Sequence, residues 1–273
     1  MLLGIDIGGT TISFGLVEGK EIVKKICVPS FPPAASLEET LAYLSGHIKE
    51  MLTPQVSHIG IGVPTLVDIQ KGIVYDALNI PSWREVHLKE YLEKRFGIPV
   101  SVNNDANCYA LGAAARVGLK EGTLVCVTMG TGTGIGIVTD GRLFCGDHCG
   151  AGELCSLLYQ DSICEAYCSK QFFENRGHDC KAASQAAMAG DLEALDLFRE
   201  YGTHVGRILA MVLYAYDPSV LVLGGGVAYT YPLFQDAMER SLRESYLYPH
   251  VLDTLRIQAM PEADTALLGA SLL

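Results

Sequence analysis

The sequence predicts an α/β protein made of two domains with a ligand cleft between them. Apolar segments rich in isoleucine and valine alternate with segments of helical periodicity along the chain. A unit of strand, glycine turn and strand occurs twice, once in residues 2–17 and again in residues 123–138. The chain has 273 residues and 49% apolar side chains, which suits two medium domains better than one.

The first half opens with three predicted strands in residues 2–28, separated by turns at Gly8-Gly9 and at Glu18-Gly19. An amphipathic helix should follow, because Ser36 and Glu39 form a capping box. Its apolar face would consist of Leu37, Leu41, Leu44, Ile48 and Leu52. A strand, a helix and a further strand complete this half, at residues 58–64, 87–97 and 99–104.

The second half repeats this pattern. A strand at 123–129 enters the glycine turn at 130–134, and a strand at 134–138 leaves it. The elements predicted after a turn at 139–141 are a long helix, an apolar strand, a helix, a strand and a closing helix, at residues 191–216, 219–225, 232–246, 254–260 and from Asp264. We expect domains at residues 1–107 and 108–261, with a terminal helix at 262–273 returning to the first domain.

The overall charge limits the partners of the protein. A formal net charge of −11 and a pI near 5.0 argue against nucleic acid or an anionic membrane as a partner. Asp6 interrupts the apolar N-terminal run, no basic stretch precedes it, and nowhere do about 18 apolar residues follow one another. We therefore expect a cytoplasmic protein whose nine cysteines are reduced thiols.

Three glycine turns follow apolar strands and are suited to hold phosphates. DIGGTT at 6–11, MGTGTGIG at 129–136 and LGGGV at 223–227 can each bring backbone amides close to an anion. A lone Gly-Gly pair would more often only make a hairpin, but three such turns in an acidic protein favour a nucleotide. No turn carries a P-loop lysine, so we expect Mg²⁺ to neutralise charge, with Asp6 as its candidate ligand, directly or through water.

Asp105 is the candidate reactive group. It lies where the strand at 99–104 gives way to a helix of small residues, which would place its carboxylate at a helix N-terminus. The same position suits an ordinary N-cap aspartate, and the segment alone leaves both roles open. Asn104 beside it offers a donor and an acceptor for a polyol hydroxyl.

Nine segments carry a resemblance that covers nearly the whole chain: DIGGTT (6–11), GIGVP (60–64), ALNIPSW (77–83), VNNDANCYALG (102–112), MGTGTGIG (129–136), GAGEL (150–154), CEAYCS (164–169), VLGGGV (222–227) and ADTALLGA (263–270). Their order and spacing resemble the ROK family of sugar kinases and repressors, in the actin-like ATPase superfamily. The resemblance implies two actin-like, ribonuclease H-like domains and a homodimer. It also implies ATP-dependent phosphorylation of a hexose, at the 6-hydroxyl of glucose or of a related hexose or amino sugar.

The same resemblance implies roles for individual residues. Asp105 would be the general base that takes the proton of the sugar hydroxyl, with ATP and Mg²⁺ as cofactors. The residues that would bind the sugar are Asn79, Asn104, Glu153, Glu165 and Ser156. The residues that would bind ATP are Asp6, Gly8, Gly9, Thr10, Thr11, Gly130, Thr131, Gly132 and Thr133 on the phosphate side, and Gly225 and Gly226 on the adenosine side.

The segment after GAGEL departs from the family pattern. The kinases usually carry a histidine three residues after the GAGE glutamate, then a cysteine loop, and these ligands bind a structural zinc. Ser156 takes the histidine position here, and the residues between Ser156 and Glu165 are too few for the loop. We therefore expect no structural zinc, and we expect the segment to be held instead by burial of Leu154, Leu157, Leu158 and Ile163. Spacing alone leaves open a four-thiolate site made of Cys145, Cys149, Cys164 and Cys168.

Two other functions are weighed against a hexose kinase. A sugar-sensing regulator of the same family would carry an N-terminal DNA-binding extension, whereas the first predicted strand begins at Leu2 and the chain is acidic. ATP hydrolysis without a sugar acceptor is disfavoured by the amide and carboxylate groups that the resemblance gathers around Asp105. A hexose kinase is therefore the leading hypothesis.

Overall fold

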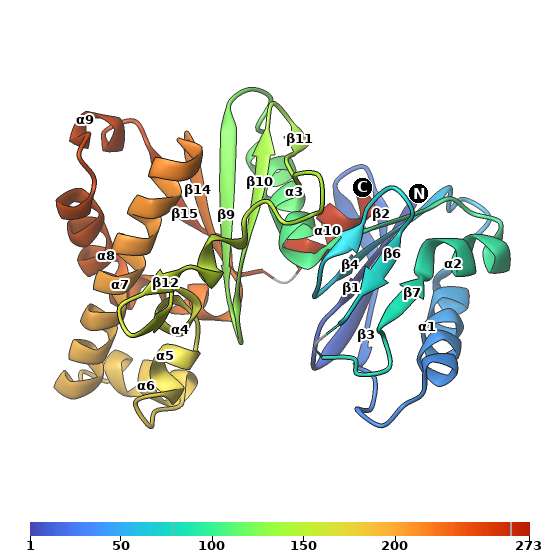
Figure 1. The fold of residues 1–273 in the computed structure, drawn as a ribbon, viewed down its shortest axis with the longest axis horizontal. Coiled ribbons are helices and arrows are strands. Elements are labelled where there is room, and N and C mark those ends of the chain that lie inside the picture. The colour runs from blue at the N-terminus through green and yellow to red at the C-terminus, as the bar shows by residue number, and fades with distance from the viewer. Residues whose placement is uncertain (78, 263) are drawn as a thin grey trace. The chain divides into compact units, whose positions relative to one another are not determined.

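The computed structural model describes residues 1–77, 79–262 and 264–273, and it has the α/β architecture that the sequence predicts (Figure 1). Two compact units share the described residues. The first comprises residues 1–120, 136–151 and 264–273, and the second comprises residues 121–135 and 152–262. The predicted domain boundary after residue 107 remains a prediction, and the predicted terminal segment 262–273 includes Ala263, which lies outside the described residues.

A five-stranded sheet forms the centre of the first unit, in the order β3-β2-β1-β4-β8. The predicted antiparallel meander is confirmed as β1 (Leu2–Ile7), β2 (Thr11–Glu18) and β3 (Glu21–Pro29). The strands that extend the sheet parallel to β1 are β4 (His58–Val63) and β8 (Val100–Asn104). A small sheet that the sequence did not predict consists of β5 (Val67–Asp68), β6 (Ile73–Tyr75) and β7 (Glu85–His87).

The helices of the first unit are α1 (Leu37–Met51), α2 (Leu88–Phe96), α3 (Asp105–Val117) and α10 (Asp264–Ser271). The capping box of α1 is confirmed, because the Glu39 amide donates to the Ser36 hydroxyl at 3.2 Å and the Ser36 amide donates to the Glu39 carboxylate at 2.8 Å. The core beneath α1 includes Trp83, whose indole Nε1 donates to the Thr40 hydroxyl at 2.8 Å. This bond satisfies a buried donor that would otherwise lower stability.

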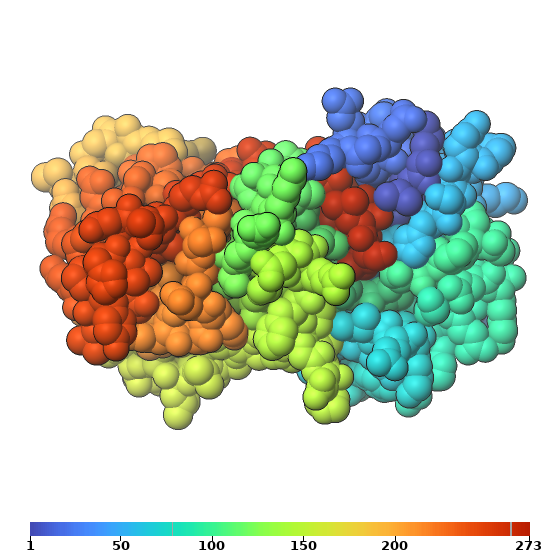
Figure 2. All heavy atoms as spheres, turned by 90° about the horizontal axis from the view of Figure 1, so that it is seen from above, coloured from blue at the N-terminus to red at the C-terminus, as the bar shows by residue number. Residues whose placement is uncertain are grey.

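Helix α10 is buried between α3 and the sheet of the first unit. In Figure 2 its red atoms lie between the green of α3 and the blue of the N-terminal strands. Glycines allow this close approach: a Cβ at Gly60 on β4 would collide with the Ala270 carbonyl, and one at Gly112 on α3 with the Thr265 carbonyl. The terminal helix is therefore an integral layer of the first unit.

The second sheet has the order β11-β10-β9-β14-β15. Its strands are β9 (Thr123–Met129), β10 (Thr133–Thr139), β11 (Arg142–Leu143), β14 (Val220–Gly224) and β15 (Arg256–Ala259). The hairpin of β9 and β10 around the glycine turn agrees with the sequence. The longest helices of the second unit, α7 (Leu192–Tyr216) and α8 (Tyr231–Ser245), also match their predicted ranges within about two residues and pack side by side (Figure 1).

The sequence predicts several helices up to the long one near 191–216, but not their bounds and not the short strands. The short elements of the second unit are the 3₁₀ helix η1 (Glu153–Ser156), β12 (Leu158–Tyr159), β13 (Ser162–Ile163), α4 (Glu165–Cys168), α5 (Gln171–Glu174), α6 (Cys180–Met188), η2 (Gly226–Thr230) and α9 (Pro249–Leu252). They lie mainly between residues 153 and 188, where the sequence shows no long period. Within the described part of the chain, no helix is both long enough and apolar enough to cross a membrane.

Candidate active site

Asp6 and Asp105 lie at the carboxyl ends of strands β1 and β8 of the first sheet. Asp6 on β1 pairs in register with Gly62 on β4, and Asp105 directly follows β8, the next strand along. The pKa of Asp6 is raised to about 7, first by burial and then by the Asp105 carboxylate, while Lys25 acts in the opposite direction. Lys25 itself pairs with Asp264 at the start of α10. Two carboxyl groups are thus held at the strand ends, where open α/β sheets bind ligands.

Asn104, and not Asp105, is the N-cap of α3. The Asn104 Oδ1 accepts hydrogen bonds from the amides of Ala106 at 2.9 Å and Asn107 at 3.3 Å. Asp105 is the first helical residue, and its Oδ1 accepts from the Ala106 amide at 2.8 Å. The alternative that Asp105 is an ordinary N-cap is therefore wrong. The Asn104 Nδ2 donates to the Thr65 carbonyl at 3.3 Å, so the protein fixes this side chain from both ends.

The first glycine turn is closed by its own backbone. The Gly8 amide donates to the Thr11 carbonyl at 2.9 Å. Ser30, the residue directly after β3, supports the turn. Its hydroxyl donates to the Gly8 carbonyl at 2.8 Å and its amide donates to the Thr10 carbonyl at 2.9 Å. Asn79 lies beside the turn: a Cβ at Gly9 would be 3.2 Å from its Nδ2. The structure thus brings together a predicted sugar ligand and the predicted phosphate turn.

A carboxylate from outside the hairpin occupies the second glycine turn. The Gly130 amide donates to the Gly132 carbonyl at 2.9 Å, while the Thr133 amide donates to Glu165 Oε2 at 2.8 Å. A Cβ at Gly132 would lie 2.6 Å from the same oxygen, so glycine leaves the space that the carboxylate fills. Glu165, predicted as a sugar ligand, therefore also contacts the predicted phosphate turn.

The third turn packs against the end of β9. Gly225 has a φ of 78°, and a Cβ there would lie 2.5 Å from the Met129 carbonyl oxygen. Met129 immediately precedes the second turn, so the second and third turns are neighbours. A Cβ at Gly226 would meet nothing within 4 Å. Gly225 is thus required by backbone packing, whereas Gly226 borders open space.

Glu153 and Ser156 are the exposed residues of the 3₁₀ helix η1. The Ser156 hydroxyl donates to Glu153 Oε2 at 3.4 Å. This bond is long for a hydroxyl donor, so it orients the carboxylate only weakly. Both side chains remain available to a ligand.

The apolar run expected to hold the segment between Glu153 and Glu165 does not do so. Leu154 is buried, but Leu157 and Leu158 are 57% and 87% exposed, and Ile163 is only half-buried. In β12 it is Tyr159 that points inwards, while Leu158 on the opposite face and Leu157 before the strand are exposed. A different group of side chains anchors the segment.

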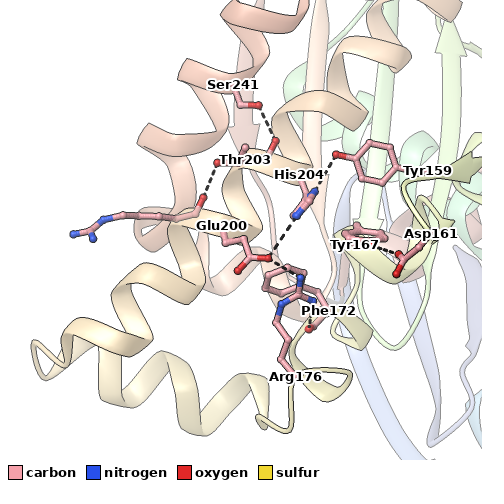
Figure 3. Close-up of polar contacts among 10 residues, drawn as sticks. Tyr159, Asp161, Tyr167, Phe172, Arg176, Glu200, Thr203, His204 and Ser241 are labelled. Carbon is pink, nitrogen blue, oxygen red and sulfur yellow. Dashed lines mark hydrogen bonds and ion pairs between the residues drawn. The ribbon is translucent and has the colours of Figure 1, made fainter.

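Three rings anchor this segment to α7 (Figure 3). The Tyr159 hydroxyl lies 2.9 Å from His204 Nδ1, and the Tyr167 ring packs at 5.1 Å from Tyr159 and 4.6 Å from His204. Tyr167 also donates to the Asp161 carboxylate in the turn between β12 and β13. We call Tyr159, Tyr167 and His204 the ring cluster. The cluster attaches β12, which carries Tyr159, and α4, which carries Tyr167, to α7.

Burial lowers the pKa of His204, which favours the neutral imidazole. The Tyr159 hydroxyl can then donate to Nδ1, and the remaining proton on Nε2 faces the Glu200 carboxylate at 3.7 Å. Glu200 pairs in turn with Arg176 at 2.6 Å (Figure 3). The guanidinium of Arg176 lies 3.8 Å above the centre of the Phe172 ring. Glu200 thus connects the ring cluster to Arg176, which lies two residues after the end of α5.

The cysteines occupy apolar or amide-lined surroundings. Cys145 and Cys149 contact Asn107 Nδ2 at 3.5 and 3.6 Å, in a turn region and not on a helix. Cys164 and Cys168 lie at the two ends of α4, and burial raises the pKa of Cys164 to about 11. Among the described residues, no group of three or more His, Cys, Asp or Glu side chains is arranged to hold a metal ion.

Sequence reasoning missed Gln171, the ring cluster and Lys25. Gln171 Nε2 donates to Glu165 Oε1 at 3.0 Å. The spacing of Glu165 and Gln171 matches no helical period, because a break at Ser169 separates α4 from α5. Lys25 alternates with apolar residues on β3 and looks like a solvated lysine. The aromatic pair Tyr159 and Tyr167, flanking the missing zinc loop, is the signal that could have indicated the ring cluster.

Comparison with known proteins identifies relatives over the whole chain. The family model described as ROK family matches residues 2–273. The glucokinase of Thermotoga maritima is 28% identical over 99% of this chain and 96% of that protein. The N-acetyl-D-glucosamine kinase of Aliivibrio salmonicida is 27% identical over 96% of this chain and 94% of that protein.

A solved structure extends the likeness to the fold. The ROK family glucokinase from Streptomyces griseus, in complex with glucose and AMPPNP, has a TM-score of 0.83 at 29% identity, over 99% of this chain and 97% of that chain. This likeness confirms the predicted two-domain, actin-like class of fold. Since the family model spans the chain almost from end to end, the protein belongs to the ROK family.

Proposed function

We propose that this protein transfers the γ-phosphoryl group of ATP to a hydroxyl of a hexose, the 6-hydroxyl of glucose or of a related hexose or amino sugar. Membership of the ROK family and the glucokinase and N-acetylglucosamine kinase relatives support this proposal. The observation that carries it is the position of Asp105, which follows β8 beside Asp6 and is not the helix cap. Such an aspartate can serve as a general base.

In this proposal Asp105 accepts the proton of the sugar hydroxyl as that oxygen attacks the γ-phosphorus. A positioned base contributes about 10²–10⁴-fold to such reactions, and the remainder comes from alignment and electrostatic stabilisation. Asn104 is held by Thr65 and by the start of α3, so its amide is oriented before a ligand arrives. Asn79, Glu153, Glu165 and Ser156 would supply the remaining polar contacts to the sugar.

The phosphates would lie against the first and second glycine turns. Gly8 and Thr133 already use their amides within the protein, as does Gly130. The amides of Gly9, Thr10, Thr11, Thr131 and Gly132 are therefore the ones we expect to face phosphate oxygens. Gly226, beside open space, suits the adenosine side together with Gly225.

The donor set fits Mg²⁺. Mg²⁺ prefers one or two carboxylates together with phosphate oxygens and waters, and Asp6 with Asp105 nearby provides such a carboxylate site. The pKa of Asp6 is raised first by burial and then by the Asp105 carboxylate, and a divalent cation would favour the ionised carboxylate. Asp6 would hold the ion directly or through water. When bound, Mg²⁺ neutralises charge on the phosphate oxygens.

A coupled ADP-release assay with ATP and Mg²⁺ tests the proposal across free hexoses, N-acetylhexosamines and glycosides. Saturable turnover on at least one free sugar is the expected result. A sugar that binds in calorimetry but is never phosphorylated would instead favour a sugar-sensing regulator. ADP release that does not depend on any sugar would identify a hydrolase.

A further inference from the structure

Both oxygens of the Glu165 carboxylate are held by donors of the second unit. Oε2 accepts from the Thr133 amide at 2.8 Å, and Oε1 accepts from Gln171 Nε2 at 3.0 Å. The Gln171 Nε2 also lies 3.5 Å from the Thr131 carbonyl oxygen. One carboxylate and one amide therefore join α4, α5 and the second glycine turn.

Further bonds attach the same helices to this turn. The Lys170 amide donates to the Gly130 carbonyl at 2.9 Å, and the Cys168 thiol lies 3.4 Å from the Thr133 hydroxyl. The Cys168 carbonyl is fixed in turn by the buried hydroxyl of Tyr201 at 2.8 Å. These bonds attach the backbone of α4 and α5 to the turn. Gln171 is the side chain that decides where the Glu165 carboxylate lies within this frame.

We propose that Gln171 is a positioning residue that couples sugar binding to phosphate binding through Glu165. The inference rests on the proposed function, in which Glu165 contacts the sugar and residues 130–133 contact the phosphates. Each carboxylate oxygen has two lone pairs, so Glu165 can accept a sugar hydroxyl while Thr133 and Gln171 hold it. A sugar that fixes Glu165 also fixes the turn, and a phosphate that fixes the turn also orders Glu165.

The first test measures this coupling by calorimetry, which needs no turnover. The affinity for AMPPNP is determined without sugar and with saturating sugar, and the ratio of the two dissociation constants is the coupling factor. We expect a wild-type factor of about fivefold or more, the usual range for coupled sites. Gln171→Leu keeps the volume but removes the donor, so its factor should fall to about one.

Gln235→Leu is the matched control. Gln235 Nε2 donates to Glu239 Oε1 at 2.8 Å on the exposed face of α8, so this variant loses the same kind of bond at another site. Its coupling factor should equal that of the wild type. An unchanged factor in Gln171→Leu, or a wild-type factor of one, overturns the inference. Turnover with unchanged coupling would overturn the inference alone, whereas sugar binding without turnover would overturn the proposed function alone.

Gln171→Glu provides a second, pH-dependent test. It places a second carboxyl group against the Glu165 carboxylate. Two ionised carboxylates repel each other, but when the pair holds one proton, the protonated acid can donate a hydrogen bond in place of the amide. The deficit in kcat/KM relative to wild type should therefore shrink as the pH falls from 8 to about 6. The other titratable groups in this region are Cys155, Cys168, Lys170 and Glu174. They are present in both proteins, so their effect on kcat/KM cancels in the ratio of variant to wild type. A deficit that is constant with pH, or a matching recovery in Gln171→Leu, contradicts the role.

Discussion

The two strand-turn-strand units have similar sequences but are stabilised differently. The first turn is closed by the Gly8 amide and supported by Ser30, both within the meander of β1, β2 and β3. The second turn is completed by Glu165, which lies 32 residues further along the chain. A turn that depends on a distant side chain can respond to what that side chain binds. The comparison therefore distinguishes a turn that is formed within its own meander from one that is coupled to a distant side chain.

The largest effect should come from Asp105, on the side of the first turn. Asp105→Asn retains the size and a polar end but cannot accept the proton, so kcat should fall by about 10² or more. Binding of ATP and the melting temperature should change little, because Asn104 provides the cap of α3. Asp253→Asn, at an exposed ion pair with Arg243, is the control. A near-wild-type rate in Asp105→Asn would exclude it as the base.

Gly132→Ala should break the coupled turn specifically. The new Cβ would occupy the position of Glu165 Oε2 and push the carboxylate away from the Thr133 amide. Losing a hydrogen bond to a charged group costs about 1.5–3 kcal/mol, so KM for both sugar and ATP should rise about tenfold or more. Gly46→Ala on α1, whose Cβ also meets nothing within 4 Å, should leave both constants unchanged. A rise in KM for ATP alone would mean that Glu165 does not contact the sugar.

Asp6 tests the electrostatics beside the first turn. Its pKa of about 7 in the folded protein lies above the usual aspartate value, so the stability it contributes is present at low pH and is lost as the pH rises towards and through 7. Without Mg²⁺, Asp6→Asn should therefore be more stable than wild type at pH 8, with a smaller difference at pH 5. Urea unfolding at the two pH values measures this. An equal difference in the free energy of unfolding at pH 5 and pH 8 would mean that ionisation of Asp6 does not destabilise the folded protein.

The ring cluster allows a smaller test of the segment that carries Glu165. Tyr159→Phe removes the donor to His204 Nδ1, which should lower the free energy of unfolding by about 1 kcal/mol and raise KM for the sugar slightly. Tyr229→Phe is the control, because that side chain is 63% exposed. Equal stability losses in the two variants would show that the bond to His204 contributes nothing specific.

The smallest expected effect is that of metal removal. If the ring cluster, and not a metal ion, orders the segment between Glu153 and Glu165, protein purified without chelators should contain well below one equivalent of zinc. EDTA should then leave the melting temperature unchanged, and activity should return once Mg²⁺ is restored. Stoichiometric zinc held by Cys145, Cys149, Cys164 or Cys168 would contradict this expectation.

Most of the fold could be predicted because its signals are local. The strands carry short apolar runs, and Ser36 with Glu39 marks the start of α1 within four residues. The sequence left open whether Asp105 caps α3, because Asn and Asp are nearly equivalent N-caps, and only the bonds from Ala106 and Asn107 to Asn104 distinguish them.

The sequence predicted which residues belong to the candidate site, but not which of them contact one another. Glu165 follows from the pattern of the chain, but its bonds to Thr133 and Gln171 depend on how α4 and α5 meet the turn. The burial of Leu158 was misjudged because hydrophobicity alone does not say which face of a two-residue strand points inwards, and Leu157 lies outside that strand. Packing between distant segments is where sequence reasoning stops.

The buried position of α10 has a consequence for the order in which the protein is made. The backbone of Gly60 on β4 and of Gly112 on α3 is covered by the last ten residues of the chain, 264–273. On the ribosome, residues 1–120 are therefore complete long before the layer that covers them emerges. The second unit, which lies between these segments in the sequence, can become compact while the first still exposes apolar surface. Emergence of residues 264–273 is thus the event that completes the first unit, and chaperone contact before that moment should concentrate on its uncovered strands.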